Sequence, residues 1–280
     1  MRGLEMMVVS EMADLLTPRP SGRTPVSGPV LFARYAFPPN SHGYCGPNDH
    51  QSFFEHGVTG EDEHGLRALS QQFAGAWPYL QLIAAELGLD DPLDRRVVDA
   101  YWVGNSRLNQ VSTRAIGNSM EERFRHRAGP GFSALTESVV AGGVPHHSFV
   151  VFCIYPWTGL LSDGRKAAHA LTVLDQCRIR WGKVLAVQGD QVVVESTPLV
   201  WDGRTLAFGD LMTETVQRSV DGTSLMDDLT EGDWVSMHWE WVCDVLSYRQ
   251  VRYLRDFTAR HLRIVNEGNL HKGPAALLGT

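Results

Sequence analysis

The chain has 280 residues, of which 43% are hydrophobic and 20% are charged, and its formal net charge is −7. This composition suits a folded globule, and the acidic balance, without clusters of Lys and Arg, argues against a nucleic-acid partner. No apolar run is long enough to span a membrane, and the N-terminal residues lack the pattern of a secretory signal. We therefore expect a cytoplasmic protein with four free cysteines: Cys45, Cys153, Cys177 and Cys243.

The order of predicted elements indicates an α+β protein built from two parts. A mainly helical domain is expected at 29–170, and a small β-barrel with a closing helix at 171–266. Residues 1–28 are rich in Pro, Ser and Gly and offer little to bury, so we expect disorder there. Residues 267–280 are expected to form a frayed tail.

Helical spacing marks several segments of the first part. Apolar residues recur at three- and four-residue steps over 66–87, where Pro78 should kink the helix or begin a second one. Asp91 followed by Pro92 signals another helix start. Two shorter helices are expected at 119–128 and 131–143.

Strand signals begin near Pro145. Residues 146–157 are β-branched and aromatic, which predicts a strand. From Cys177 onward, short strands alternate with Gly and Asp turns, a spacing typical of a small sandwich or barrel. These predicted strands lie within 177–188, 191–203, 204–222 and 233–246. Helical spacing returns over 247–266.

The strand-rich segment also carries a particular set of residues. Cys177 precedes Gly182-Lys183-Val184, and Gly232-Asp233 opens a later strand that contains His238. A helix follows at 248–262. In this combination the segment resembles the HypC/HupF family of hydrogenase-maturation chaperones over about 177–266. The resemblance implies a HypC-like, OB-like β-barrel with a C-terminal helix.

The same resemblance implies a function. Cys177 would be the thiolate that holds an iron fragment carrying cyanide and carbon monoxide, with His238 as its neighbour. The fragment would pass, with a scaffold protein, to the large subunit of a NiFe hydrogenase. A soft thiolate suits low-spin iron, and Lys183 with the two Arg residues around Ile179 would lower the thiol pKa if they lie near it. Alternatively, Cys177 is a buried strand residue of a recruited barrel.

A second thiol supports a different interpretation. Cys45 lies in a loop rich in Gly and Pro, where Tyr44 and Asn48 are candidate cofactor contacts together with Lys183. With His146 or His147 as its base, Cys45 would be the nucleophile of a thiol-dependent enzyme. The structural alternative is a plain turn, because Gly, Pro and Asn are turn residues.

Two further possibilities stay open. Cys45 and Cys177 could face one another across the domain interface and share one metal fragment. The chain could also be a non-catalytic binding module for a small molecule or a protein. The aromatic runs 155–157 and 239–241 would then line a ligand pocket, although such residues more often pack in a core. Cys153 and Cys243 lie in apolar strand-like runs and are expected to be core thiols.

Overall fold

The computed structural model describes residues 25–59, 64–128 and 132–268. The disorder expected at 1–28 and the tail expected at 267–280 fall almost wholly outside these ranges. The helices of the first part are α2 (Gly28–Ser41), α3 (His50–Thr59), α4 (His64–Ser70), α5 (Trp77–Glu86), α6 (Arg95–Trp102), α7 (Thr113–Ala128), α8 (Phe132–Val140), α9 (His147–Phe149) and α10 (Ala167–Cys177). Single turns of 3-10 helix lie at η1 (Ser106–Gln110) and η4 (Thr158–Ser162), and a π-helical turn lies at η3 (Val150–Ile154).

Several helix boundaries follow from local sequence. The predicted helix at 66–87 is divided into α4 and α5, and Pro78 occupies the first turn of α5, as expected for a residue without a backbone N–H. The predicted cap at Asp91 is wrong, because the side chain of Asp94 caps α6 by accepting from the Arg96 N–H. Asp91 instead forms an ion pair with Arg67 at 2.8 Å.

The strand predicted at 146–157 is also wrong. These residues form α9 and η3, in which Val150, Val151 and Phe152 are buried. A short β-branched and aromatic run suits a buried strand and a buried helical turn equally well, since neither shows an exposed face in its spacing. This correction places His147 at the start of a helix instead of on a strand.

The second part is a five-stranded sheet that closes on itself. Its strands are β1 (Arg180–Gln188), β2 (Gln191–Ser196), β5 (Met212–Gln217), β8 (Trp234–His238) and β9 (Trp241–Leu246). They follow the order β1-β2-β5-β9-β8, and β8 pairs back onto β1. All of these pairs are antiparallel except β5 with β9, which are parallel and joined at Gln217 and Trp241. The single parallel pair makes this closed sheet a mixed one.

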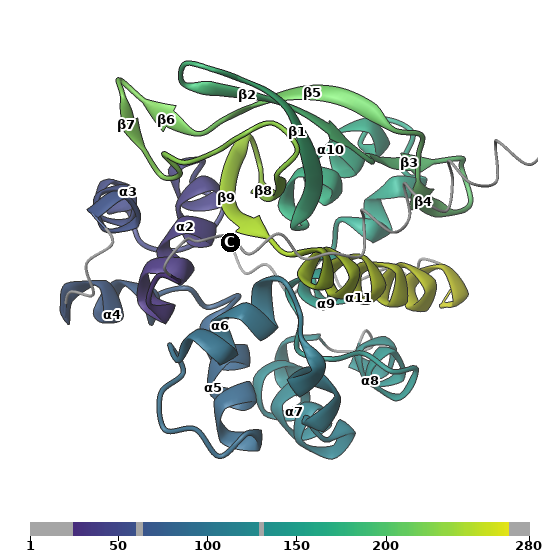
Figure 1. Ribbon diagram of the computed structural model, residues 1–280. Coiled ribbons are helices and arrows are strands. Elements are labelled where there is room, and N and C mark those ends of the chain that lie inside the picture. The colour runs from purple at the N-terminus through teal and green to yellow at the C-terminus, as the bar shows by residue number, and fades with distance from the viewer. Residues whose placement is uncertain (1–24, 60–63, 129–131, 269–280) are drawn as a thin grey trace, which may run out of the picture.

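Two hairpins and a long helix complete the sheet region. β3 (Leu199–Trp201) pairs with β4 (Leu206–Phe208), and β6 (Ser219–Val220) pairs with β7 (Thr223–Ser224). The last helix, α11 (Tyr248–Glu267), begins at a capping box formed by Ser247 and Gln250 and agrees with the helix predicted at 247–266. Figure 1 shows the strands in the upper part of the molecule, α5 to α8 in the lower part, and α11 running between them.

The helices and the closed sheet share one apolar core. Buried side chains of α2 and α6 join those of β8 and β9 in a single cluster. Tyr35 of α2 reaches the sheet, where its hydroxyl lies 2.7 Å from the Ser236 hydroxyl of β8. The seam between the two parts is therefore packed like a protein interior. Among the helices that the structure describes, none has both the length and the apolar character needed to cross a membrane.

Candidate metal centre

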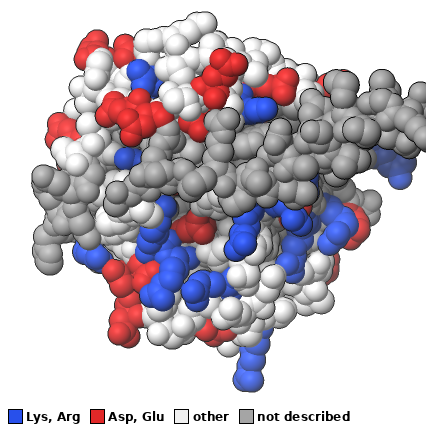
Figure 2. Space-filling view, viewed as in Figure 1, with Lys and Arg blue, Asp and Glu red and all other residues white. Residues whose placement is uncertain are grey.

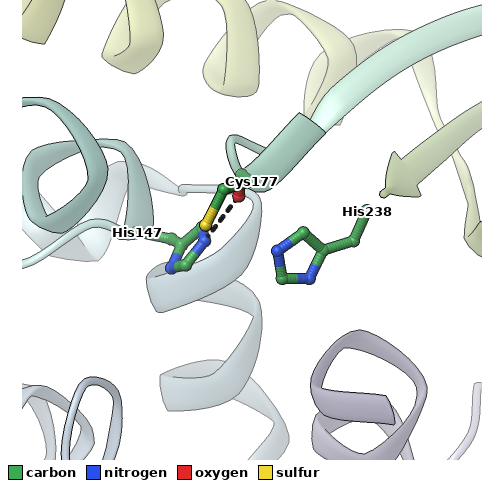
Figure 3. Close-up of side chains that lie close together, drawn as sticks. All are labelled: His147, Cys177 and His238. Atoms are coloured by element: carbon green, nitrogen blue, oxygen red, sulfur yellow. Dashed lines mark hydrogen bonds between the residues drawn. The ribbon is translucent and has the colours of Figure 1, made fainter. Parts of the chain in front are cut away.

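Three side chains that can bind a metal meet at this seam (Figure 3). His147 begins α9, Cys177 ends α10, and His238 ends β8. One nitrogen from each imidazole and the Cys177 sulfur all lie within 4.8 Å of one another. The sequence predicted Cys177 and His238 as metal ligands. It named His147 only as a base for Cys45, and it placed Cys177 on a strand instead of at the end of a helix.

Hydrogen bonding fixes the tautomer of His238. Its Nδ1 lies 2.7 Å from the backbone oxygen of Tyr35. A carbonyl oxygen only accepts, so Nδ1 carries the hydrogen. Burial, followed by the nearby His147, lowers the pKa of His238 well below its usual value, so the ring is neutral. Its Nε2 therefore presents a lone pair, and this atom is buried without a hydrogen-bond partner among the described residues.

His147 is held through both ring nitrogens. Its Nε2 donates to the backbone oxygen of Cys177 at 2.8 Å, which Figure 3 marks with a dashed line. Its Nδ1 lies 3.2 Å from the Tyr101 hydroxyl, which in turn lies 3.1 Å from the Gly75 carbonyl oxygen. Burial lowers the pKa of His147 to about 4, so this ring is neutral as well. Neutral imidazoles are the form that binds metals.

Cys177 is 9% exposed as a whole residue. Burial, followed by the nearby Cys45, raises the thiol pKa, so the group is protonated at neutral pH. The prediction that basic neighbours lower this pKa is therefore wrong. Arg178 pairs instead with Asp175, and Arg180 pairs with Glu214.

A cavity of about 120 Å³ adjoins the three side chains. Both imidazoles and the thiols of Cys45 and Cys177 line it. Most of the remaining wall is aromatic and includes Tyr44, Tyr101, Trp102, Tyr155, Trp157 and Trp239. Apolar walls exclude water and strengthen every electrostatic contact inside. Of the two aromatic runs singled out in the sequence, Tyr155, Trp157 and Trp239 line this cavity, whereas Trp241 does not.

Two segments meet at the edge of the cavity. Tyr44, which is 47% exposed, stacks on Trp239 with ring centroids 4.5 Å apart. Beside this stack, His42 contacts Glu240 at 2.8 Å. Trp239 has a φ of +54°, a left-handed backbone conformation that non-glycine residues rarely adopt. The tight turn between β8 and β9 thus places the Trp239 indole next to His238 at some cost in backbone strain.

Charged side chains adjoin this cavity without lining it, since Arg180 donates to the Trp239 carbonyl oxygen and Glu240 follows Trp239 in the chain. On the face shown in Figure 2, Asp and Glu gather over the closed sheet, and Lys and Arg gather over the helices below it. No Asp, Glu, Lys or Arg side chain from the described ranges is among the residues that line the cavity. Any net charge introduced there would have to be balanced by the bound group itself.

The other predicted site residues divide into two sets. Cys45, Tyr44 and His147 share the cavity, whereas His146 and Asn48 do not line it. Asn48 is exposed in the loop after α2. Lys183 is partly exposed on β1 and does not line the cavity either. Burial raises the pKa of the Cys45 thiol to about 12, so this thiol is not activated as a nucleophile.

Sequence reasoning missed two residues that shape the site. Tyr101 hydrogen-bonds to His147, and Trp102 packs on both imidazoles, with ring centroids 4.6 Å from His147 and 5.6 Å from His238. Both lie on the buried face of α6, together with Val97 and Val98. Only their three-dimensional neighbours distinguish these two residues from the rest of that face.

The three candidate ligands lie within a stretch of the chain that matches a known protein family. The family model for DUF6390, a family of unknown function, matches residues 24–272. The chain belongs to this family. Its matched range contains α2 to α11 and all three candidate ligands. Neither the curated proteins nor the solved structures contain a match to the chain.

Proposed function

We propose that this member of DUF6390 binds a transition-metal ion, or a small metal fragment, through His147, Cys177 and His238. The unpaired Nε2 lone pair of His238, buried beside the Cys177 sulfur, is the observation that carries the proposal. A buried acceptor without a donor is costly in a folded protein. A metal ion at this point would satisfy the lone pair.

The hydrogen bonds around the site suit metal binding. The Tyr35 carbonyl holds His238 with Nε2 free, which is how many metal-bound histidines are oriented. His147 would offer its Nε2 once the proton moves to Nδ1. The Nδ1 hydrogen would then be donated to the Tyr101 hydroxyl, and that hydroxyl would donate to the Gly75 carbonyl oxygen. His147 and the Tyr101 hydroxyl keep their partners in this metal-bound state, whereas the Cys177 carbonyl oxygen gives up the hydrogen bond that it now accepts.

The donor set suggests which metals fit. One thiolate and two imidazoles are soft or borderline ligands, which favour iron, zinc, copper or nickel over magnesium and calcium. The thiol must lose its proton to bind. Since burial raises its pKa, this proton is present at neutral pH and would be released on binding.

The HypC resemblance suggests a cargo for this site. An iron fragment with cyanide and carbon monoxide would be held by Cys177 and His238, and His147 would add a third ligand. The chain would then act as a chaperone in NiFe-hydrogenase maturation, with the large subunit or a maturation scaffold as its partner. The closeness of the Cys177 sulfur and the His238 imidazole supports this proposal, although Cys177 ends a helix here.

Metal analysis of protein purified without oxygen tests the metal site. We expect about one metal per chain in the wild type and in the matched control Cys153→Ser, whose thiol lies outside the site. Cys177→Ser should lose the metal. The affinity for added metal should rise about tenfold per pH unit near neutrality, because one thiol proton is released. Equal metal content in all three proteins would contradict the proposal.

Infrared spectroscopy tests the cargo separately. Protein co-expressed with the hydrogenase-maturation machinery should show cyanide and carbonyl stretching bands that disappear in Cys177→Ser. Metal without these bands would reject the iron fragment and leave a simple metal site. The thiol-enzyme alternative predicts rapid alkylation of Cys45, which its raised pKa disfavours.

A further inference from the structure

The candidate ligand set leaves a metal ion incomplete. Three protein ligands with an open fourth position is the usual arrangement of a metal site that binds a further small ligand. The fourth ligand would have to come from the cavity that the two imidazoles and the Cys177 thiol line. With a volume of about 120 Å³, this cavity suits a ligand of a few non-hydrogen atoms, since an apolar cavity of about 150 Å³ holds one benzene molecule.

The charge of the site restricts what that ligand can be. A divalent metal ion with one thiolate and two neutral imidazoles has a net charge of about +1. No charged side chain from the described ranges lines the cavity to offset it. An uncompensated buried charge is strongly unfavourable. A ligand that brings one negative charge would make the filled site neutral.

Two tryptophans that line the cavity carry buried indole N–H groups without an acceptor among the described residues. The indole Nε1 atoms of Trp102 and Trp239 are buried and have no hydrogen-bond partner among the described residues. Both side chains line the cavity, and they are 2% and 8% exposed. Buried donors without acceptors are uncommon in folded proteins. A bound ligand with lone pairs to spare would satisfy them.

We infer that the fourth position of the metal is taken by a small monoanion that accepts hydrogen bonds from the indole N–H groups of Trp102 and Trp239. This inference rests on the proposed metal site and adds the chemical class of its ligand. The anion supplies the missing negative charge, its size suits the cavity, and its lone pairs satisfy the two donors. A neutral ligand of the same size would leave the net charge uncompensated.

Cobalt(II) and two probe ligands test the inference. Cobalt bound by a thiolate gives absorption bands that report both metal binding and changes in the fourth ligand. Azide is a small monoanion of three atoms with lone pairs at its ends, and imidazole is a neutral metal ligand with five ring atoms. We expect azide to shift the cobalt bands and to bind at least about tenfold more tightly than imidazole, since a neutralised buried charge is worth more than about 1.4 kcal/mol.

Tryptophan variants show whether the indole donors contribute. Trp239→Phe and Trp102→Phe keep an aromatic ring and remove the N–H, so azide should bind about tenfold more weakly, as expected for a lost hydrogen bond to a charged group. The matched control is Trp77→Phe, because Trp77 is a partly buried tryptophan that does not line the cavity. This control and all imidazole affinities should stay unchanged.

The outcomes separate the two proposals. If cobalt gives no thiolate bands in the wild type, the metal site and the anion inference both fail. If cobalt binds but imidazole binds as tightly as azide, only the anion inference is overturned. The same holds if neither indole variant weakens azide binding. Trp102 packs on Tyr35 and both imidazoles, so Trp239→Phe decides the question should Trp102→Phe fail to fold.

Discussion

Two clusters of buried histidines lie next to each other in this protein. They differ in whether an unpartnered ring nitrogen carries a hydrogen or a lone pair. In the first, His261 donates from Nδ1 to the Ser148 hydroxyl at 2.7 Å, and this hydroxyl donates to Nδ1 of His146 at 2.7 Å. Nε2 of His261 accepts from the Val144 N–H at 3.4 Å. The second cluster is formed by His147, Cys177 and His238.

The comparison shows how a structural histidine differs from a candidate ligand. Nδ1 of His146 accepts hydrogen bonds, so its neutral ring carries the hydrogen on Nε2. Among the described residues, the only acceptor near that nitrogen is the poorly placed Val103 backbone, and a nitrogen that carries a hydrogen cannot bind a metal. His238 has the opposite tautomer, so its unpartnered Nε2 carries a lone pair. His146 and His238 are equally buried, and the direction of the hydrogen bond at Nδ1 separates these two residues.

Acid should destabilise both histidine clusters, and this is the largest change in the free energy of unfolding that we expect. Burial lowers the pKa of His146 to about 3 and that of His147 to about 4. The unfolded chain therefore binds more protons below pH 6.5, so stability is complete above that pH and is lost as pH falls toward 4. Each of these histidines should add about 1.4 kcal/mol per pH unit to the slope of the free energy of unfolding against pH. Urea unfolding between pH 4.5 and 7.5 measures it.

The buried carboxyl group of Asp244 changes the pH dependence of stability in the opposite direction. Burial raises the pKa of Asp244 to about 6, so its contribution is present at low pH and is lost as pH rises through 6. Asp244→Asn should therefore steepen the acid loss between pH 4 and 6. Stability that does not change from pH 7 to pH 4.5 would contradict the neutral, buried state of the histidines.

Removing the lone pair of His238 should affect only the second cluster. In His238→Asn the amide N–H can still donate to the Tyr35 carbonyl, while the Nε2 ligand is lost. We expect metal affinity to fall by about 100-fold or more, equivalent to about 2.7 kcal/mol, and the free energy of unfolding to change little. Cobalt titration and urea unfolding measure the two effects. Unchanged metal affinity would remove His238 from the ligand set.

Ser148→Ala should affect only the first cluster. The change leaves the Nδ1 hydrogen of His261 without an acceptor, which should cost about 1–3 kcal/mol of unfolding free energy. Metal affinity should stay within about twofold, since Ser148 does not line the cavity. A large loss of metal affinity with normal stability would mean that the two clusters act as one unit.

The smallest effect is expected at Tyr101, which orients His147 from outside the ligand set. Tyr101→Phe removes the hydroxyl that Nδ1 of His147 would donate to in the metal-bound state. Loss of such an outer partner typically weakens metal binding about 10-fold. Cobalt titration of this variant, with Tyr79→Phe as the buried tyrosine control, measures the difference. An equal loss in both variants would assign the effect to packing.

The closed sheet was easier to predict than the helical region. The Gly-Asp turn before Gln191 and the short alternating strands determine the ends of β1 and β2 by local chemistry. The segment at 146–157 failed because it is buried on all sides, and spacing cannot then distinguish a strand from a helical turn. The HypC resemblance beyond the fold class stays a prediction.

Part of the candidate site could be predicted, and part could not. Cys177 and His238 were identified together because their spacing around Gly182-Lys183-Val184 resembles a known family. His147 was singled out for its residue type and was assigned another partner, because sequence does not show which side of a short helix faces which thiol. The hydrogen bond from His238 to the Tyr35 carbonyl joins residues 203 positions apart. No local pattern in the sequence reports such a contact.

The three candidate ligands come from both halves of the molecule: His147 and Cys177 from the helices, and His238 from the closed sheet. A bound ion would therefore act as a cross-link across the seam, stabilising the chain in proportion to its occupancy. Metal binding would hold the two halves together, and release of a cargo would first require them to separate. Resistance to proteolysis at this seam would then report whether the protein is loaded.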